Sequence, residues 1–456
     1  MHRSSGNPGS QPRRSATAVG ITMALLLGLS MSVPPAATAA TDPTVYWTGT
    51  AGPVAIPGKT WGLVAALPLP KGRFHVSATA TLIGRADSPN IRQQVACRLI
   101  LGSRKDQILA SPSRSDRGGS RMSLLLTVSG RLKSPASARV RCYGGDRRDD
   151  VRIRDIRISA VKAGRLTLQD GLNLGAKRTN IGSGSPRIIS ASGAGIFVPG
   201  DSAYHEVGSL ALPAGRWWLT AKAVARAAGA PGTESGGQRC RLVAGVDHDD
   251  LMFGLASGAS PATSSIVPLA LQVVHRFRTP ASIVLECRAP TVMAVSDVAI
   301  TALKAGRLTN IPLEAAVGTS TGQGSPRVIS GWANGPVDIP VRATYKTIRS
   351  LELPKGRWTV LAKLWFAAGG SILSRPAANG VARTYCRLAF GKHTTPTQLR
   401  YVADSSATAP LVLSVNHRAT SPQKVKLQCR RANAAGGGDA YFIKITALRA
   451  GSLVRR

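Results

Sequence analysis

Four consecutive residues, Asp247-His248-Asp249-Asp250, have the side chains best suited to bind a metal ion in this chain. Carboxylate oxygens and imidazole nitrogens are common ligands of divalent cations. The corresponding loops in two related parts of the chain begin Gly102-Ser103-Arg104-Lys105-Asp106 and Gly391-Lys392-His393-Thr394, so the cluster is not repeated. We therefore favour a solvated acidic loop and predict neither a metal site nor a cofactor.

The chain contains three related segments, and two of them have a histidine at the same place before a proline turn, in His275-Arg276 and His417-Arg418. The first segment has Gly130-Arg131 at this place. A repeated histidine can serve as a base or ligand, but one copy lacks it, so we interpret both as polar turn residues. A nucleophilic serine would need a sharp turn such as Gly-x-Ser-x-Gly with partners. Gly182-Ser183-Gly184 does not fit that pattern, and we predict no catalytic residues and no enzyme.

Basic residues dominate the charge of the chain, which is +37 formally. From Arg327 to the end, 21 lysines and arginines face four acids. Such an excess attracts polyanions, although charged outer faces can also simply keep β-domains soluble and unpaired. The candidate polyanion-binding residues are Lys424, Lys426, Arg430 and Arg431, and we expect this part of the chain to bind more tightly than the first.

These residues are expected to be positioned by strands, because the same turn sequence occurs three times, each time before a strand-like pattern. The three copies are Leu69-Pro70-Lys71-Gly72-Arg73-Phe74, Leu212-Pro213-Ala214-Gly215-Arg216-Trp217 and Leu353-Pro354-Lys355-Gly356-Arg357-Trp358. A tight Pro-Gly corner followed by alternating apolar residues indicates a half-buried strand. Trp217 and Trp358 share the core parity. Trp218 and Trp365 have the opposite parity, where they could stack on sugars or, as we prefer, cover a sheet edge or an interface between repeats.

Each copy holds roughly eight short strands separated by Gly and Pro, without an amphipathic helix, which predicts an all-β fold of three tandem β-sandwiches. We assign residues 1–40 to a signal peptide, 41–170, 187–310 and 327–456 to repeats 1, 2 and 3, and 171–186 and 311–326 to linkers. Each repeat is expected to fold alone.

The six cysteines fall two per repeat. Six thiols allow 15 pairings in principle, and no Cys-x-x-Cys spacing indicates a metal site. One equivalent pair per repeat in an exported chain favours Cys97–Cys142, Cys240–Cys287 and Cys386–Cys429.

The N-terminus has the pattern of a secretory signal: Arg3, Arg13 and Arg14, an apolar run from Ala18 to Leu29, and the small residues Ala37-Thr38-Ala39-Ala40. No later apolar run approaches the roughly 20 residues needed to span a bilayer. We expect a secreted, extracellular protein with no membrane span in the mature chain.

The Pro-x-Gly-aromatic corner before a long alternating strand, with a last apolar strand ending near Gly, resembles the jelly-roll sandwich of the C1q and tumour-necrosis-factor superfamily. The chain also resembles secreted actinobacterial proteins of tandem β-domains with no assigned activity. It departs from the superfamily in its intradomain cysteine pairs and in carrying three copies in one chain, so no ligand residues are carried over.

The function expected from the sequence is non-catalytic binding or a structural role at the cell envelope. The expected partner is a polyanionic cell-wall polymer, an acidic glycan or extracellular nucleic acid. Two alternatives stay open: a carbohydrate-binding adhesin that uses exposed aromatics, and a hydrolase with its site in the variable loops.

Overall fold

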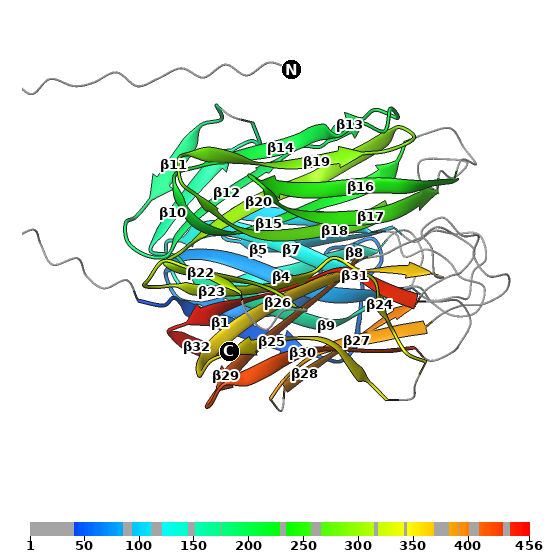
Figure 1. The fold of residues 1–456 in the computed structure, drawn as a ribbon. Helices are drawn as coiled ribbons and strands as arrows, with labels where there is room; N and C mark the ends of the chain where they lie inside the picture. The colour runs from blue at the N-terminus through cyan, green and yellow to red at the C-terminus, as the bar shows by residue number, and fades with distance from the viewer. Residues whose placement is uncertain are drawn as a thin grey trace, which may run out of the picture. The chain divides into compact units, whose positions relative to one another are not determined.

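The computed structural model describes residues 41–456 except 85–93, 111–120, 145–150, 174, 229–233, 257–265, 314–317, 342–343, 369–382, 392, 401–409 and 432–437. The expected signal peptide at residues 1–40 lies outside the described residues. In the described part every regular element is a strand (Figure 1), and no helix there is long and apolar enough to cross a membrane.

The first repeat forms an inner sheet in which β1, β9, β4 and β7 are neighbours, and an outer sheet in the order β3-β8-β5-β6. Its strands are β1 (Thr44–Thr50), β2 (Val54–Ala55), β3 (Gly62–Leu69), β4 (Gly72–Gly84), β5 (Val95–Leu101), β6 (Arg104–Ala110), β7 (Arg121–Leu132), β8 (Ala136–Gly144) and β9 (Val151–Lys162).

The second repeat has the same order, with an inner sheet β12-β20-β15-β18 and an outer sheet β14-β19-β16-β17. Its strands, with the two that precede it, are β10 (Arg165–Asp170), β11 (Arg178–Ile181), β12 (Arg187–Gly193), β13 (Ile196–Val198), β14 (His205–Leu212), β15 (Gly215–Ala227), β16 (Glu234–Ala244), β17 (Asp247–Ala256), β18 (Ile266–Phe277), β19 (Ala281–Arg288) and β20 (Met293–Ala305). The range 171–186, expected as a linker, contains β11.

The third repeat again pairs an inner sheet, β23-β31-β26-β29, with an outer sheet, β25-β30-β27-β28. Its strands, with the two that precede it and the last of the chain, are β21 (Arg307–Pro312), β22 (Thr319–Thr321), β23 (Arg327–Ala333), β24 (Val337–Asp338), β25 (Lys346–Leu353), β26 (Gly356–Ala368), β27 (Arg383–Phe390), β28 (His393–Arg400), β29 (Pro410–Ala419), β30 (Gln423–Arg431), β31 (Gly438–Ala450) and β32 (Ser452–Arg455). The predicted fold of three jelly-roll-like β-sandwiches is confirmed.

The repeated corner fixes the core aromatic of each sandwich. Gly215 and Gly356 have φ of 147° and 157°, which glycine adopts without strain. Trp217 and Trp358 follow two residues later, are fully buried, and donate their indole N–H to Pro213 O at 3.1 Å and Pro354 O at 2.9 Å. In the second and third repeats the corner therefore positions the indole ring and also accepts its one polar hydrogen.

The predicted disulfides Cys97–Cys142, Cys240–Cys287 and Cys386–Cys429 are all formed. In each repeat the two cysteines face each other on neighbouring strands of the outer sheet, β5 and β8, β16 and β19, or β27 and β30.

Each repeat gives its last strand to another repeat. β10 leaves the first repeat and pairs in parallel with β12, and β21 leaves the second and pairs in parallel with β23. β32, the last strand of the chain, pairs in parallel with β1 of the first repeat. The expectation that each repeat folds alone does not fit this exchange, because every inner sheet takes a strand from outside its own repeat.

A repeated glycine makes the crossing possible. A side chain at Gly164 would lie 2.5 Å from the backbone of Gly184 and Ser185, and one at Gly306 would lie 2.5 Å from Ser325 N. A side chain at Gly451 would lie equally close to Asp42 O. Each of these glycines follows an alanine, and the Ala-Gly pair marks the point where the outgoing strand passes the incoming chain.

The three repeats meet in a cycle. Leu125, Ala270 and Val412 occupy the same position in β7, β18 and β29, and they pack against one another. Trp365 packs with the core cluster of the second repeat and lies with its ring centroid 5.2 Å from that of Tyr441. The side chain of Trp365 is 1% exposed, and this placement agrees with the preferred packing role at an interface between repeats.

Candidate functional site

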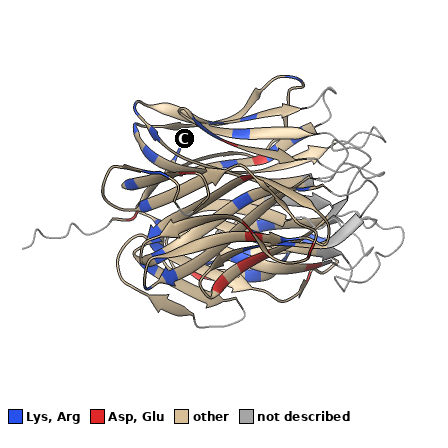
Figure 2. Ribbon diagram, turned by 90° about the horizontal axis from the view of Figure 1, so that it is seen from above, with Lys and Arg blue, Asp and Glu red and all other residues tan. Residues whose placement is uncertain are grey.

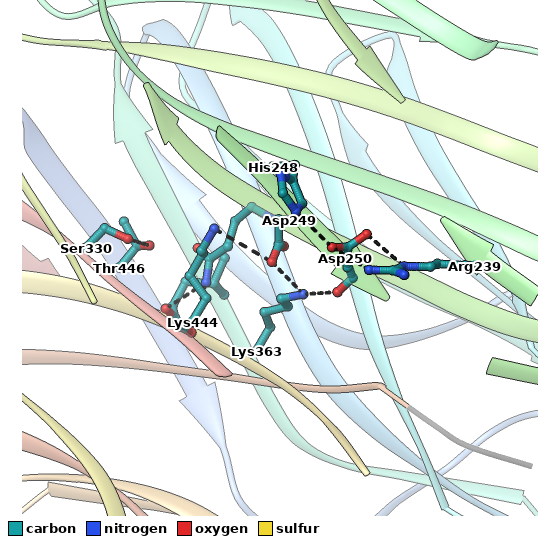
Figure 3. Close-up of polar contacts among 10 residues, drawn as sticks. Arg239, His248, Asp249, Asp250, Ser330, Lys363, Lys444 and Thr446 are labelled. Carbon is teal, nitrogen blue, oxygen red and sulfur yellow. Dashed lines mark hydrogen bonds and ion pairs between the residues drawn. The ribbon is translucent and has the colours of Figure 1, made fainter. Parts of the chain in front are cut away.

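The Asp247–Asp250 stretch is the start of strand β17, and the interpretation of it as a solvated loop is wrong. Asp249 and Asp250 are each 5% exposed. Lys363 of the third repeat places Nζ 2.8 Å from Asp249 Oδ1 and donates to Asp250 O at 2.7 Å. The backbone N–H of Gln272 donates to Asp249 Oδ2 at 2.7 Å, and Lys444 Nζ lies 3.7 Å from Oδ1 (Figure 3).

This network joins the second repeat to the third, and a matching network joins the first to the second. Lys222 Nζ lies 2.6 Å from Asp106 Oδ1, whose other oxygen accepts from the N–H of Thr127 at 2.7 Å. Burial raises the pKa of Asp106, and Lys222 opposes that shift. Burial lowers the pKa of Lys363, and Asp249 opposes it. Because one partner without the other would be a buried lone charge, each pair holds its two repeats in one register.

The remaining candidate ligands of this stretch are also engaged. Asp250 forms an ion pair with Arg239 at 2.9 Å and lies 3.3 Å from His248 Nε2. Across the described residues, no group of three or more His, Cys, Asp or Glu side chains could hold a metal ion.

The two histidines of the proline turns lie against a glycine turn of the outer sheet. His275 Nδ1 is 2.7 Å from Asp247 Oδ2, and its ring is where a side chain at Gly245 would lie. His417 has the same relation to Gly391 and hydrogen-bonds to Gln423 at 3.3 Å. Both histidines belong to strands, β18 and β29, and fill the gap next to the turn.

The predicted polyanion-binding residues of β30 divide into two kinds. Lys424 and Lys426 are exposed and alternate with the buried Val425 and Leu427, as the strand period requires. Arg431 has the parity of the core, is 9% exposed, and lies 3.8 Å from Asp338. Arg431 is therefore not part of the outer surface.

Arg430 is held by aromatic rings on that surface. Its guanidinium lies 5.3 Å from the ring centroid of Tyr345 and 4.8 Å from that of Tyr385. A related stack recurs in each repeat, because the arginine after the first cysteine lies over the aromatic that precedes the first strand of the same outer sheet: Arg98 over Trp61 at 4.0 Å, Arg241 over Tyr204 at 3.8 Å, and Arg387 over Tyr345 at 4.2 Å. Such stacking restricts the arginine and leaves its charge in place.

The residue before the second cysteine sets the charge of each outer face. In the second repeat it is Glu286, which forms an ion pair with Arg241. In the third it is Gln428, which accepts a hydrogen bond from Arg387 at 2.8 Å without adding charge. In the first it is Arg141, which lies directly across from Arg98. The outer faces of the first and third repeats therefore lack the acid that partly neutralises the second.

The sequence interpretation missed the paired charges between repeats. Asp106 and Asp249 each follow the first cysteine of their repeat by nine positions, and Lys222 and Lys363 each follow the core tryptophan by five. These equal spacings could have been recognised in the sequence as a shared feature of the repeats. Its meaning was not visible in one repeat, because the aspartate and its lysine belong to different repeats.

No family model and no curated protein matches the chain. One similar solved structure, described as the triple jelly roll fold and turret assembly in an archaeal virus, has 8% identity and a TM-score of 0.18, with 90% of this chain and 92% of that chain covered. Another, the atomic structure of Sulfolobus turreted icosahedral virus, has 10% identity and a TM-score of 0.21, with 87% and 85% covered.

Proposed function

We propose that this chain is a secreted, non-catalytic protein that binds extracellular or cell-wall polyanions through the outer sheets of its first and third repeats. The observation that carries the proposal is the change from Glu286 in the second repeat to Arg141 and Gln428 in the other two. Figure 2 is consistent with it, since basic positions outnumber acidic ones along the described strands.

The outer sheet of the first repeat contributes more basic residues to the proposed binding surface than was expected when tighter binding was assigned to the third repeat. Lys105 and Arg139 are exposed, and their strand positions place them on the same face as Arg98 and Arg141. Acidic residues near the end of the first repeat could weaken binding of a polyanion. One of them, Asp155, lies in the inner sheet in an ion pair with Arg154 at 2.9 Å. The other three, Asp146, Asp149 and Asp150, lie outside the described residues. We therefore expect both repeats to contribute.

The face of the third repeat combines a flexible and a fixed part. Lys424 and Lys426 project from neighbouring outward positions of β30, while Arg387 and Arg430 are held on Tyr345. Glu352 lies across from Lys424 at the strand β25. Rows of cations with this strand spacing suit a phosphate- or carboxylate-bearing polymer, and they carry no base or sugar specificity.

The open alternatives gain less support. Trp365 is buried, and Trp218 packs beside an apolar cluster between repeats, so neither is a free platform for sugar rings. Much of the variable loops, where a hydrolase site was conceivable, lies outside the described residues.

The test uses the intact mature chain, because the repeats share strands. Binding to teichoic acid, heparin and DNA is measured between 50 and 200 mM salt for the wild type and for Lys424→Gln/Lys426→Gln. If each lysine contacts one phosphate, the double variant should lower the slope of log affinity against log salt on duplex DNA by about 2.

The matched control removes two exposed lysines from the repeated corners, Lys71→Gln/Lys355→Gln. It has the same net charge as the first variant and should keep most of the slope. Equal losses in both variants would show diffuse attraction without a binding face. Affinity that ignores salt would remove the polyanion proposal altogether.

A further inference from the structure

The contact between the third repeat and the first differs from the other two contacts of the cycle. The positions of Lys222 and Lys363 are taken here by Thr79, and those of Asp106 and Asp249 by Thr395. Thr79 Oγ1 forms a 2.8 Å hydrogen bond with Ser414 Oγ, and Thr395 Oγ1 accepts a hydrogen bond from the backbone N–H of Leu388 at 3.1 Å. This contact therefore has no counterpart of the buried lysine–aspartate pair.

Side chains also fill this contact between repeats less completely than they fill the other two. Val224 and Trp365 occupy one position of β15 and β26 and insert into the core cluster of the preceding repeat. The equivalent residue of β4 is Thr81, which is smaller than Trp365 and polar. A cavity of about 170 Å³ lies here, lined by Thr79, Thr81, Thr395 and Ser414 together with Trp47 and Arg157.

This contact has a basic residue, Arg157, but a threonine where the other two contacts have the aspartate. Arg157 occupies the position of Lys444, which lies 3.7 Å from Asp249 in the second contact. Here Arg157 Nη2 reaches Thr394 O at 3.5 Å. The N–H of Ser414 occupies the position from which Thr127 and Gln272 donate to their aspartates. The surroundings that hold a carboxylate twice in this molecule thus recur with the carboxylate removed.

A second cation strengthens the positive charge of the cavity. Arg455 of β32 belongs to its lining and lies over the Trp47 ring at 5.3 Å. Burial lowers the pKa of Arg157, Asp155 opposes that shift, and the charge of Arg455 adds to it. Asp155, also in the lining, is in an ion pair with Arg154 at 2.9 Å. An anion in the cavity would therefore face two guanidinium groups and one aspartate that already has a cation.

We propose that this cavity binds a small organic carboxylate, with its anionic group paired to Arg157 and its body against Trp47. Guanidinium and carboxylate match as a two-point hydrogen-bonded pair. The volume is comparable with a cavity of about 150 Å³ that accepts benzene, so an aromatic acid of one ring fits. The site is separate from the outer faces and does not depend on the proposed polyanion binding.

The test measures binding of benzoate to the intact chain by calorimetry, with neutral benzamide and inorganic phosphate as comparisons. Benzoate should bind at least tenfold more tightly than either. Arg157→Gln should weaken benzoate at least tenfold, and Arg157→Lys should weaken it less. Thr395→Asp, which supplies the carboxylate found in the other two contacts, should also weaken benzoate at least tenfold while keeping the fold.

The matched control is Arg152→Gln, an exposed arginine on the same strand β9. It should leave benzoate affinity within twofold, as should Lys424→Gln/Lys426→Gln. Equal loss in Arg152→Gln would mean general charge attraction and would overturn the site. Benzoate binding that survives both Arg157→Gln and Thr395→Asp, or no benzoate binding by the wild type, would overturn it as well.

Discussion

His75 is a half-buried histidine whose neighbours offer it little compensation for a positive charge. It lies on β4 beside a cavity of about 40 Å³, and its Nδ1 is 2.9 Å from Ser129 Oγ. Burial lowers its pKa to about 4, from an ordinary value of 6.5. The imidazole is therefore neutral in the folded protein at neutral pH, and acid must either charge it in place or unfold the region around it.

We expect His75 to make the protein acid-sensitive. Its pKa is lower in the folded state, so between pH 6.5 and about 4 the unfolded chain binds more protons, and the free energy of unfolding falls as pH falls. The full loss is on the order of 3 kcal/mol. Denaturant melts at pH 7 and pH 4.5 should show it. His75→Thr, the residue type of the third repeat at this position, should lose much of the pH dependence; an unchanged dependence would contradict the assignment.

At the same scale, the sequence predicted which residues share a face but not how many faces are buried. The parity of Trp217 and Trp358 was right, and both are fully buried. Trp365 has the opposite parity and is buried too, because it packs into the core cluster of the preceding, second repeat. Alternation reports a difference between two faces, and it cannot reveal a partner that approaches from outside the repeat.

Among the elements, the four-residue strand β32 forms the edge of the first inner sheet. It pairs with β1 and adds Leu453 and Val454 to clusters of the first repeat and of the interface between repeats. Without it, β1 would be an unpaired edge. The strand pattern of each repeat predicted the sandwiches. A short stretch such as Arg165–Asp170, however, has the same strand-like sequence pattern whether it joins the sheet of its own repeat or that of the next one. The exchange depends on contacts between repeats, which no local pattern encodes.

Deleting residues 452–456 should lower the free energy of unfolding by about 2–3 kcal/mol, because two half-buried aliphatic side chains and four backbone pairings are lost. Thermal melts and size-exclusion chromatography would show it, the latter because the exposed edge of β1 can pair between molecules. Deletion of Arg456 alone is the control. A deletion variant as stable and as monodisperse as that control would mean that β32 does not close the cycle.

On the scale of the whole molecule, two of the three contacts between repeats are fastened by buried lysine–aspartate pairs and the third contains a cavity. The sequence predicted the overall positive charge and its excess in the third repeat. It did not predict how charges pair across repeats, because Asp106 and Lys222 are separated by more than a hundred residues and meet only when the first and second repeats pack together.

The closure of the cycle by β1 and β32 also decides how the molecule carries mechanical load. The two strands are parallel, so a pull on the chain before Thr44 and after Arg455 slides one strand along the other, and the four pairs from Thr44–Ser452 to Trp47–Arg455 resist together. Handles at positions 71 and 133 would instead open the antiparallel pair β4–β7 from one end, one bond at a time. Single-molecule pulling through the two ends should need the larger rupture force, and equal forces would contradict this. A protein anchored by one end and bound to a polymer near the other would then bear tension through the shear of its first and last strands.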